Sequence, residues 1–172
     1  MKKIIRAVFL CCLCFAFAMS TSLAAPLPNE VKVGGSVVKM GDKIESAIKA
    51  FGRPWHITNE KNYFWRDNIN LYSPEVVAKT FGNSKKIYEL IIDGVPTINT
   101  PEGIGIGSTK EAVEQAYGKG KERRIAGGDI ILSYGKDEKY APYVRFRLNG
   151  KTNVVYYMVI GSPDNPKNKK RR

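Results

Sequence analysis

The sequence contains three cysteines, and all of them lie within its first fourteen residues. Cys11, Cys12 and Cys14 fall inside an apolar run that predicts a cleaved leader, so the mature chain is expected to have no cysteine. A chain without cysteine has no disulfide framework, no thiolate nucleophile and no cysteine-based zinc site. We therefore expect the folded protein to be stabilised by packing alone.

Histidine is nearly absent as well, since His56 in the stretch RPWHITNEK is the only one. The chain has neither the CxxC nor the HExxH pattern of metal sites, and its glycine-rich stretches GIGIG and IAGGDI match no phosphate-binding motif. His56 is interpreted as an ordinary loop residue. Asp67 is the most suggestive acid, but no second placed acid accompanies it for hydrolysis. We predict a protein that is not an enzyme and that uses no cofactor and no metal.

Residues 1–24 are predicted to be a signal peptide. Basic residues come first, an unbroken apolar run extends from Ala7 to Met19, and small residues follow up to Ala24. Cleavage after Ala24 predicts an exported protein, periplasmic or extracellular. An uncleaved membrane anchor is the alternative, although the run is shorter than the roughly 20 apolar residues of a spanning helix.

The formal net charge of the chain is +12. Residues 162–172 are expected to form a disordered basic tail, in which the segment from Lys167 to Arg172 carries the bases. This tail either keeps the protein in solution or adheres to an anionic lipid or polysaccharide. The charge on the rest of the mature chain is too mild for a nucleic-acid binder, so nucleic acid is not an expected partner.

Two segments share one pattern: GDKIESAIKAFG at 41–52 and GSTKEAVEQAYG at 107–118. Each predicts a short helix that starts at a capping residue, Asp42 or Ser108, and ends at a glycine suited to the left-handed conformation. Apolar residues recur at helical spacing between these ends, so each helix has one face to bury.

Runs rich in β-branched and aromatic residues follow each helix and predict strands. They cover 63–72, 76–81, 85–93, 129–134, 143–148 and 153–160. The sequence thus predicts an α+β fold of two tandem repeats, each a short helix packed on an antiparallel β-sheet. The first repeat is assigned to residues 25–100 and the second to 101–161. The residues leave open whether the two repeats share one sheet.

The segments GIGIGSTKEAVEQAYGK and VVKMGDKIESAIKAFGRPW, with the strands after them, resemble a known αβ repeat. It is the repeat of β-lactamase inhibitor protein and of the SmpA/OmlA (BamE-type) envelope lipoproteins. This resemblance implies an exported, non-enzymatic protein that binds other proteins, with a tandem pair forming one concave sheet surface. The chain departs from these families in lacking the disulfides of the inhibitor and the lipid-anchor cysteine of the lipoproteins.

Aromatic and basic residues alternate on the predicted strands, which suggests a binding surface. In YVRFRL, the set Val144, Phe146 and Leu148 is assigned to the core, so that the alternate residues point to an open sheet face. The next strand adds Tyr156 or Tyr157, depending on register. In YFWRDNINLY, one side carries Tyr63 and Trp65 and the other carries Phe64, Arg66 and Tyr72. The predicted contact residues are Trp65, Arg66, Tyr72, Tyr143, Arg145, Arg147 and Tyr157.

These contact residues are of the types that dominate protein interfaces. The predicted function is therefore a cofactor-free protein-binding module, inhibitor-like or part of envelope assembly, that acts through the open face of its sheet. The aromatic residues could instead pack the two repeats against each other or fill the pleats. The alternative function is an envelope-associated structural or carrier protein that binds anionic lipid or polysaccharide through Lys167–Arg172 and the basic body.

Overall fold

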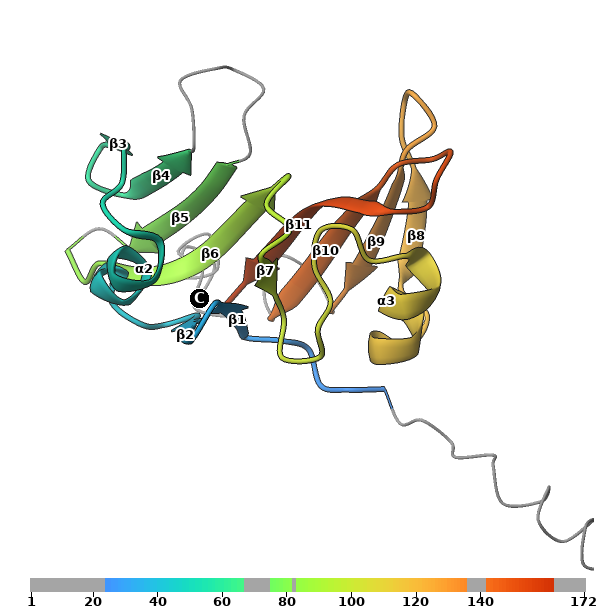
Figure 1. Cartoon of the computed structure of the whole chain (residues 1–172), viewed down its shortest axis with the longest axis horizontal. Helices are drawn as coiled ribbons and strands as arrows, with labels where there is room; N and C mark the ends of the chain where they lie inside the picture. The colour runs from blue at the N-terminus through green and yellow to red at the C-terminus, as the bar shows by residue number, and fades with distance from the viewer. Residues whose placement is uncertain (1–23, 67–74, 82, 136–141, 163–172) are drawn as a thin grey trace, which may run out of the picture.

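The chain folds around one large antiparallel β-sheet (Figure 1). The computed structural model describes residues 24–66, 75–81, 83–135 and 142–162. Residues 1–23 of the predicted leader, Asp67, Tyr72 and the basic tail beyond residue 162 lie outside the described residues. Neither helix of the described part is long and apolar enough to cross a membrane.

Eight strands form the large sheet in the order β3-β4-β5-β6-β11-β10-β9-β8. Their bounds are β3 (His56–Thr58), β4 (Asn62–Arg66), β5 (Glu75–Phe81), β6 (Lys86–Asp93), β8 (Lys121–Arg124), β9 (Ile130–Tyr134), β10 (Tyr143–Leu148) and β11 (Val155–Gly161). The central pairing joins β6 to β11, with Ile91 opposite Val159. Strands from both halves of the chain therefore form one continuous sheet.

A second layer covers one face of this sheet (Figure 1). It consists of helices α2 (Ile44–Phe51) and α3 (Lys110–Tyr117) and of a small sheet, ordered β2-β1-β7. The strands of the small sheet are β1 (Glu30–Val33), β2 (Ser36–Lys39) and β7 (Ile98–Asn99). This sheet lies between the two helices and closes the middle of the layer.

The predicted α+β fold of two helix-plus-sheet repeats is wrong. The structure is mostly β, with 48% strand and 13% helix, and its eight-stranded sheet does not divide into two sheets each under its own helix. The physical reason is that a separate sheet in each half would leave β6 and β11 as apolar edges. Their pairing removes both edges, and the small sheet buries the region that the short helices cannot reach.

The positions of both helices follow their end signals. Gly52 and Gly118 terminate them with positive φ angles of 83° and 77°, as predicted. The N-caps differ from the prediction by one residue. Thr109, rather than Ser108, accepts the hydrogen bond from the Ala112 amide, because the Ser108 hydroxyl accepts one from Gly105.

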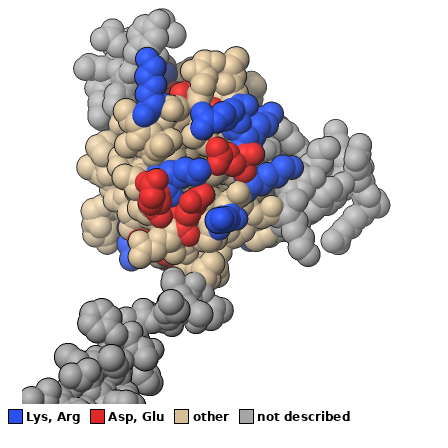
Figure 2. Space-filling view, turned by 90° about the vertical axis from the view of Figure 1, so that its right-hand side faces the viewer, with Lys and Arg blue, Asp and Glu red and all other residues tan. Residues whose placement is uncertain are grey.

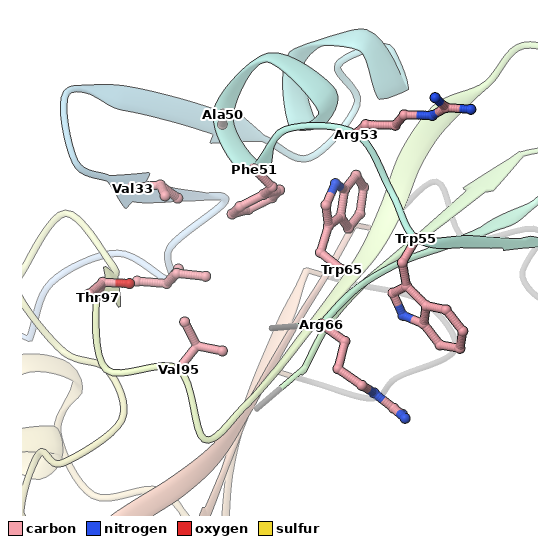
Figure 3. Close-up of a pocket in the computed structure, with 10 residues that line it drawn as sticks. Val33, Ala50, Phe51, Arg53, Trp55, Trp65, Arg66, Val95 and Thr97 are labelled. Atoms are coloured by element: carbon pink, nitrogen blue, oxygen red, sulfur yellow. The ribbon is translucent and has the colours of Figure 1, made fainter. Parts of the chain in front are cut away.

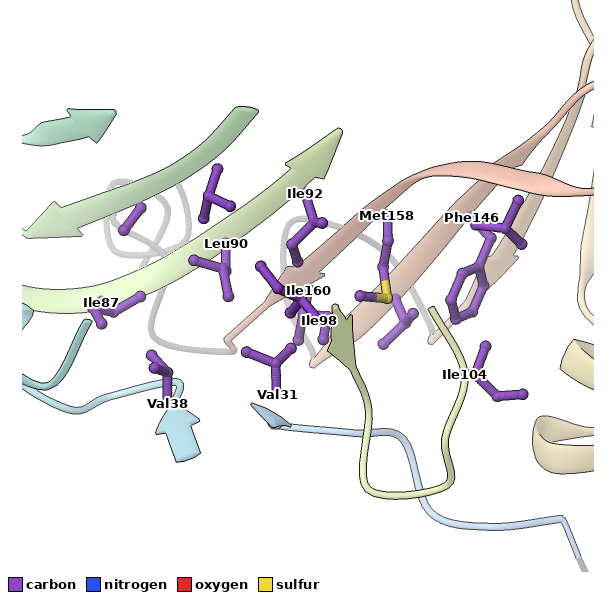
Figure 4. Packing of buried hydrophobic residues seen from close by; sticks show 14 of the residues in the cluster. Val31, Val38, Ile87, Leu90, Ile92, Ile98, Ile104, Phe146, Met158 and Ile160 are labelled. Carbon is purple, nitrogen blue, oxygen red and sulfur yellow. The ribbon is translucent and has the colours of Figure 1, made fainter. Parts of the chain in front are cut away.

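The core lies between the large sheet and the covering layer (Figure 4). Val144, Phe146 and Leu148 of β10 are buried there, as the alternation predicts. The ring of Phe146 lies 6.0 Å from that of Tyr117 on α3, which anchors this helix to the sheet. Figure 4 shows that the buried aliphatic side chains continue across β6 and β11 without a break. The two halves of the chain therefore share one core.

The turn between β3 and β4 carries local strain that a substitution should relieve. Asn59 and Glu60 have φ angles of 52° and 54°, and the Lys61 amide donates to the Thr58 carbonyl. This is a two-residue hairpin turn whose second position favours glycine. We expect Glu60→Gly to raise the free energy of unfolding by about 0.5 kcal/mol, because the left-handed conformation costs a non-glycine residue roughly 1 kcal/mol or more.

Urea-induced unfolding of the variant and the wild type measures this gain. Glu60→Ala is the matched control, since it removes the same carboxylate but keeps a Cβ in the left-handed conformation. An equal gain from the alanine variant would assign the effect to charge and contradict the strain argument.

Candidate functional site

One face of the large sheet points away from the covering layer, and we call it the open face. No helix or strand of the described residues packs on it. The strand register aligns its side chains in rows that cross the strands. One row contains His56, Phe64, Val77, Ile91, Val159, Arg145, Ser133 and Lys121. The adjacent row contains Arg66, Glu75, Asp93, Tyr157, Arg147, Ile131 and Arg123.

The centre of the open face is polar and internally paired. The Lys79 ammonium lies 2.6 Å from a Glu89 carboxylate oxygen, and the Tyr143 hydroxyl donates to the other oxygen of Glu89. Burial works against the charge of Lys79, but the hydrogen bond and the charge of Glu89 outweigh it and raise the pKa of Lys79. Burial and the same carboxylate raise the pKa of Tyr143, so the phenol stays protonated. These groups hold one another in place.

The end of the open face near β8 and β10 is cationic. Arg147 lies over the Tyr157 ring, with its guanidinium carbon 5.6 Å from the ring centroid. Burial lowers the pKa of Arg145, and the positive charges of Arg123 and Arg147 add to this effect. Asp129 has its pKa lowered by hydrogen bonds from the Tyr156 hydroxyl and the Gly150 amide, and by the charge of Arg147.

The opposite end of the open face is aromatic. Trp55 is 51% exposed, and its ring lies 5.2 Å from that of His56, which lies 5.7 Å from Phe64. Arg66 lies over Trp55 at 5.3 Å and pairs with Glu75 at 3.0 Å. A large exposed ring next to a fixed guanidinium is a common contact element at interfaces.

A pocket of about 310 Å³ lies beside this aromatic end (Figure 3). Phe51 and Trp65 form one wall, and Val33 and Val95 face them across the pocket. The Trp65 indole donates to the Gly52 carbonyl at 2.7 Å, which fixes its ring against the end of α2. Apolar side chains therefore face one another across the pocket, while the guanidinium of Arg53 points outward at the rim (Figure 3).

The predicted contact residues that the structure describes differ in the face of the sheet on which they lie and in how exposed they are. Arg66, Arg145, Arg147 and Tyr157 are half-buried residues of the open face, and their role as contact residues stays a prediction. Trp65 is an exception, because it is 7% exposed and belongs to the opposite, core face. Tyr72 lies outside the described residues.

Tyr143 is on the open face but is only 5% exposed. It pairs with Gly161 of β11, and a Cβ built on this glycine would come within 2.2 Å of the Tyr143 ring. The ring therefore lies flat over the glycine, with its hydroxyl bound to Glu89. The prediction of Tyr143 as a contact residue is wrong for this reason.

A β-bulge determines which residues of β11 point to the open face. Arg147 pairs with Tyr157 and Leu148 pairs with Val155, which leaves Tyr156 as the extra residue. Val155 and Met158 are both buried in the core, so the two tyrosines between them both point to the open face. The sequence predicted only one of them there.

Sequence reasoning missed Trp55 and Ile91 as members of the open face, and it placed Phe64 on the same side as Arg66 without predicting it as a contact residue. Residues 53–62 were interpreted as a loop, because the strand β3 has only three residues. Phe64 could have been predicted as a contact residue, since it alternates with Trp65 on a predicted strand. Among the described residues, no cluster of histidine, cysteine, aspartate or glutamate could hold a metal ion.

No protein-family profile and no curated protein matches the chain. Three solved structures are similar to it. A cysteine-rich secretory protein from Staphylococcus aureus subsp. aureus Mu50 has a TM-score of 0.50 and 14% identity, over 81% of this chain and 49% of that one. At this identity the similarity shows the fold alone.

The two other structures are more distant in fold. An extracellular protein containing an SCP domain, from Bacillus anthracis str. Ames, has a TM-score of 0.48 and 12% identity over 77% of this chain and 46% of its own. A DUF4309 family protein from Bacillus subtilis subsp. subtilis str. 168 has a TM-score of 0.42 and 13% identity, over 76% and 81%. The chain thus spans about half the length of the secretory and SCP-containing proteins.

Proposed function

We propose that this protein is an exported, cofactor-free protein-binding module, in the periplasm or outside the cell, that holds its partner on the open face. The observation that carries the proposal is this face itself. It extends over eight strands, no described element covers it, and it carries half-buried arginine and aromatic side chains together with the half-buried Ile91. Such a mixture is typical of the energetic centre of protein interfaces.

The internal pairs of the open face support the same proposal. Arg66 is held by Glu75, and Arg147 lies against Tyr157, so both cations keep one position before a partner arrives. A surface whose side chains are already ordered loses less conformational entropy on binding.

Photocrosslinking in the cells that produce the protein tests the proposal. A photoreactive amino acid is placed at Arg147 or Tyr157 on the open face, and at Lys49, an exposed residue of α2, as the control. We expect discrete protein adducts from positions 147 and 157 and none from position 49. Adducts of equal yield from position 49, or no adducts from the open face, would contradict the proposal.

Deleting Lys167–Arg172 distinguishes the protein-binding module from the alternative function, an envelope-bound carrier. The binding module is expected to keep its adducts at positions 147 and 157 after the deletion. A loss of both the adducts and a salt-sensitive membrane association would favour the carrier, since polybasic segments bind anionic surfaces electrostatically.

A further inference from the structure

We infer that the partner docks an acidic protein segment on the cationic end of the open face, against Lys121, Arg123, Arg145 and Arg147. This inference rests on the proposed function and adds the chemistry of the partner. We call these four residues the basic cluster.

The strand register brings the basic cluster together. Arg123 and Arg147 both pair with Ile131 of β9, while Lys121 and Arg145 both pair with Ser133. Only β9 separates the two outer strands, so bases in one row stand about 10 Å apart. Bases two residues apart on one strand are separated by about 7 Å. The cluster thus forms a compact patch of four positive charges.

Two acids near this patch are hydrogen-bonded to groups outside it. Glu122 of β8 points to the opposite face, where it lies 2.7 Å from the Lys110 ammonium of α3. Asp129 accepts hydrogen bonds from Tyr156 and Gly150. Among the described residues, neither Arg123 nor Arg147 makes an ion pair. Burial is the first cause of the lowered pKa of Arg145; the charges of Tyr157 and Glu89 oppose this shift, and those of Arg123 and Arg147 add to it.

The limited width of the cluster favours a protein segment over a membrane or another extended polyanion. Asp93 and Glu75 follow Arg147 and Tyr157 in the same row, and Asp93 is two strands, about 10 Å, from Arg147. Figure 2 shows that the end of the molecule beyond β8 and α3 also carries both signs of charge intermixed. A flat anionic surface would therefore meet acids on either side, whereas two or three carboxylates fit the cluster alone.

The side chains next to the cluster define the rest of the segment. Val159 lies directly opposite Arg145, and Ile91 and Val77 continue this row. Val159 and Val77 are only 5% and 7% exposed, so the half-buried Ile91 is the aliphatic side chain of this row that a partner can reach. Ile91 is two strands, about 10 Å, from Arg145. In an extended segment this distance corresponds to about three residues. The expected partner sequence has glutamate or aspartate residues followed at this spacing by bulky aliphatic ones.

Fluorescence anisotropy with a labelled peptide tests the inference. The probe carries two glutamates, a glycine and two leucines, and matched peptides replace the glutamates with lysines or the leucines with serines. We expect the glutamate–leucine peptide to bind the wild type in low salt, and the lysine peptide not to bind. The double variant Arg145→Gln, Arg147→Gln is expected to bind it at least about tenfold more weakly.

Two controls make this loss specific. Lys32→Gln, Lys49→Gln removes the same charge from exposed positions of β1 and α2 and is expected to bind the peptide as the wild type does. Urea unfolding of each variant shows whether it is folded, and Arg145→Lys, Arg147→Lys is expected to recover part of the affinity because charge is retained. An equal loss in the control pair, or equal binding of the lysine peptide, would overturn the inference.

Failure of the inference is distinguishable from failure of the proposed function. If the double variant Arg145→Gln, Arg147→Gln still forms adducts at position 157, the proposed protein-binding function is retained. The inference that the partner carries an acidic segment is then rejected. Binding of the wild type and the double variant to phosphatidylglycerol vesicles is measured as a further comparison. If the double variant loses vesicle binding but not peptide binding, the cluster serves a lipid surface and the inference is wrong.

Discussion

Replacing Phe146 with alanine is expected to lower the free energy of unfolding by about 3–5 kcal/mol. Phe146 is fully buried, and its ring lies 6.0 Å from Tyr117 and 6.1 Å from Tyr134. Truncation leaves a cavity between α3 and the sheet that these rings cannot fill without leaving their own positions. Equilibrium unfolding in urea, followed by circular dichroism, measures the loss.

Phe64→Ala is the matched control, because Phe64 is a half-buried residue of the open face. We expect it to cost less than about 1.5 kcal/mol. Similar losses from both substitutions would show that the ring cluster around Phe146 is not the centre of the core.

The two tryptophans of the chain add a second readout to this experiment. Trp55 and Trp65 lie at the α2 end, far along the sheet from Phe146, so their fluorescence reports on the other half of the molecule. Because both halves share one core, the Phe146→Ala variant should shift the fluorescence transition as much as the circular dichroism transition. A fluorescence midpoint that stays at its wild-type value would contradict a single cooperative unit.

Gly161→Ala is expected to lower the free energy of unfolding by about 1–3 kcal/mol. The added methyl group would overlap the ring of Tyr143, so the ring must leave its place over the strand and give up its hydrogen bond to Glu89. Glu89 would then keep Lys79 as its partner. Urea unfolding measures the cost.

Gly35→Ala is the control for the glycine substitution, because nothing lies near its Cβ position and its φ is not positive. It is expected to change stability by less than about 0.5 kcal/mol. The double variant Gly161→Ala, Tyr143→Ala should lose less than the sum of the two single losses. Full additivity would show that the ring and the glycine do not act together.

Local signals in the sequence predicted the local structure well. The glycines at positions 52 and 118 end the helices where expected, and the alternation in residues 143–148 assigned Val144, Phe146 and Leu148 correctly to the core. These features depend on neighbouring residues only. The edge strands were missed for the same reason: β8 has the sequence KERR, without an apolar residue, and β3 has three residues.

Pairings between distant segments were not predictable in this way. No local feature of β6 or β11 indicates that these strands join, and this pairing turned the expected repeats into one sheet. The same limit explains the errors in the site. The side of β4 that faces the core could not be chosen while both sides carried aromatic residues. The burial of Tyr143 depends on a glycine in another strand.

The pairing of β6 with β11 has a consequence for how the chain folds. β11 is the last strand of the described chain and is therefore synthesised after β6. Until β11 pairs with it, β6 has an unpaired backbone edge, and its side chains Leu90 and Ile92 are not yet covered. Contacts between such distant segments form slowly, and unpaired apolar edges invite aggregation. A partly emerged chain is therefore the most vulnerable state of this protein. Safe folding requires that the whole chain arrive together, or that a chaperone shield the waiting strand.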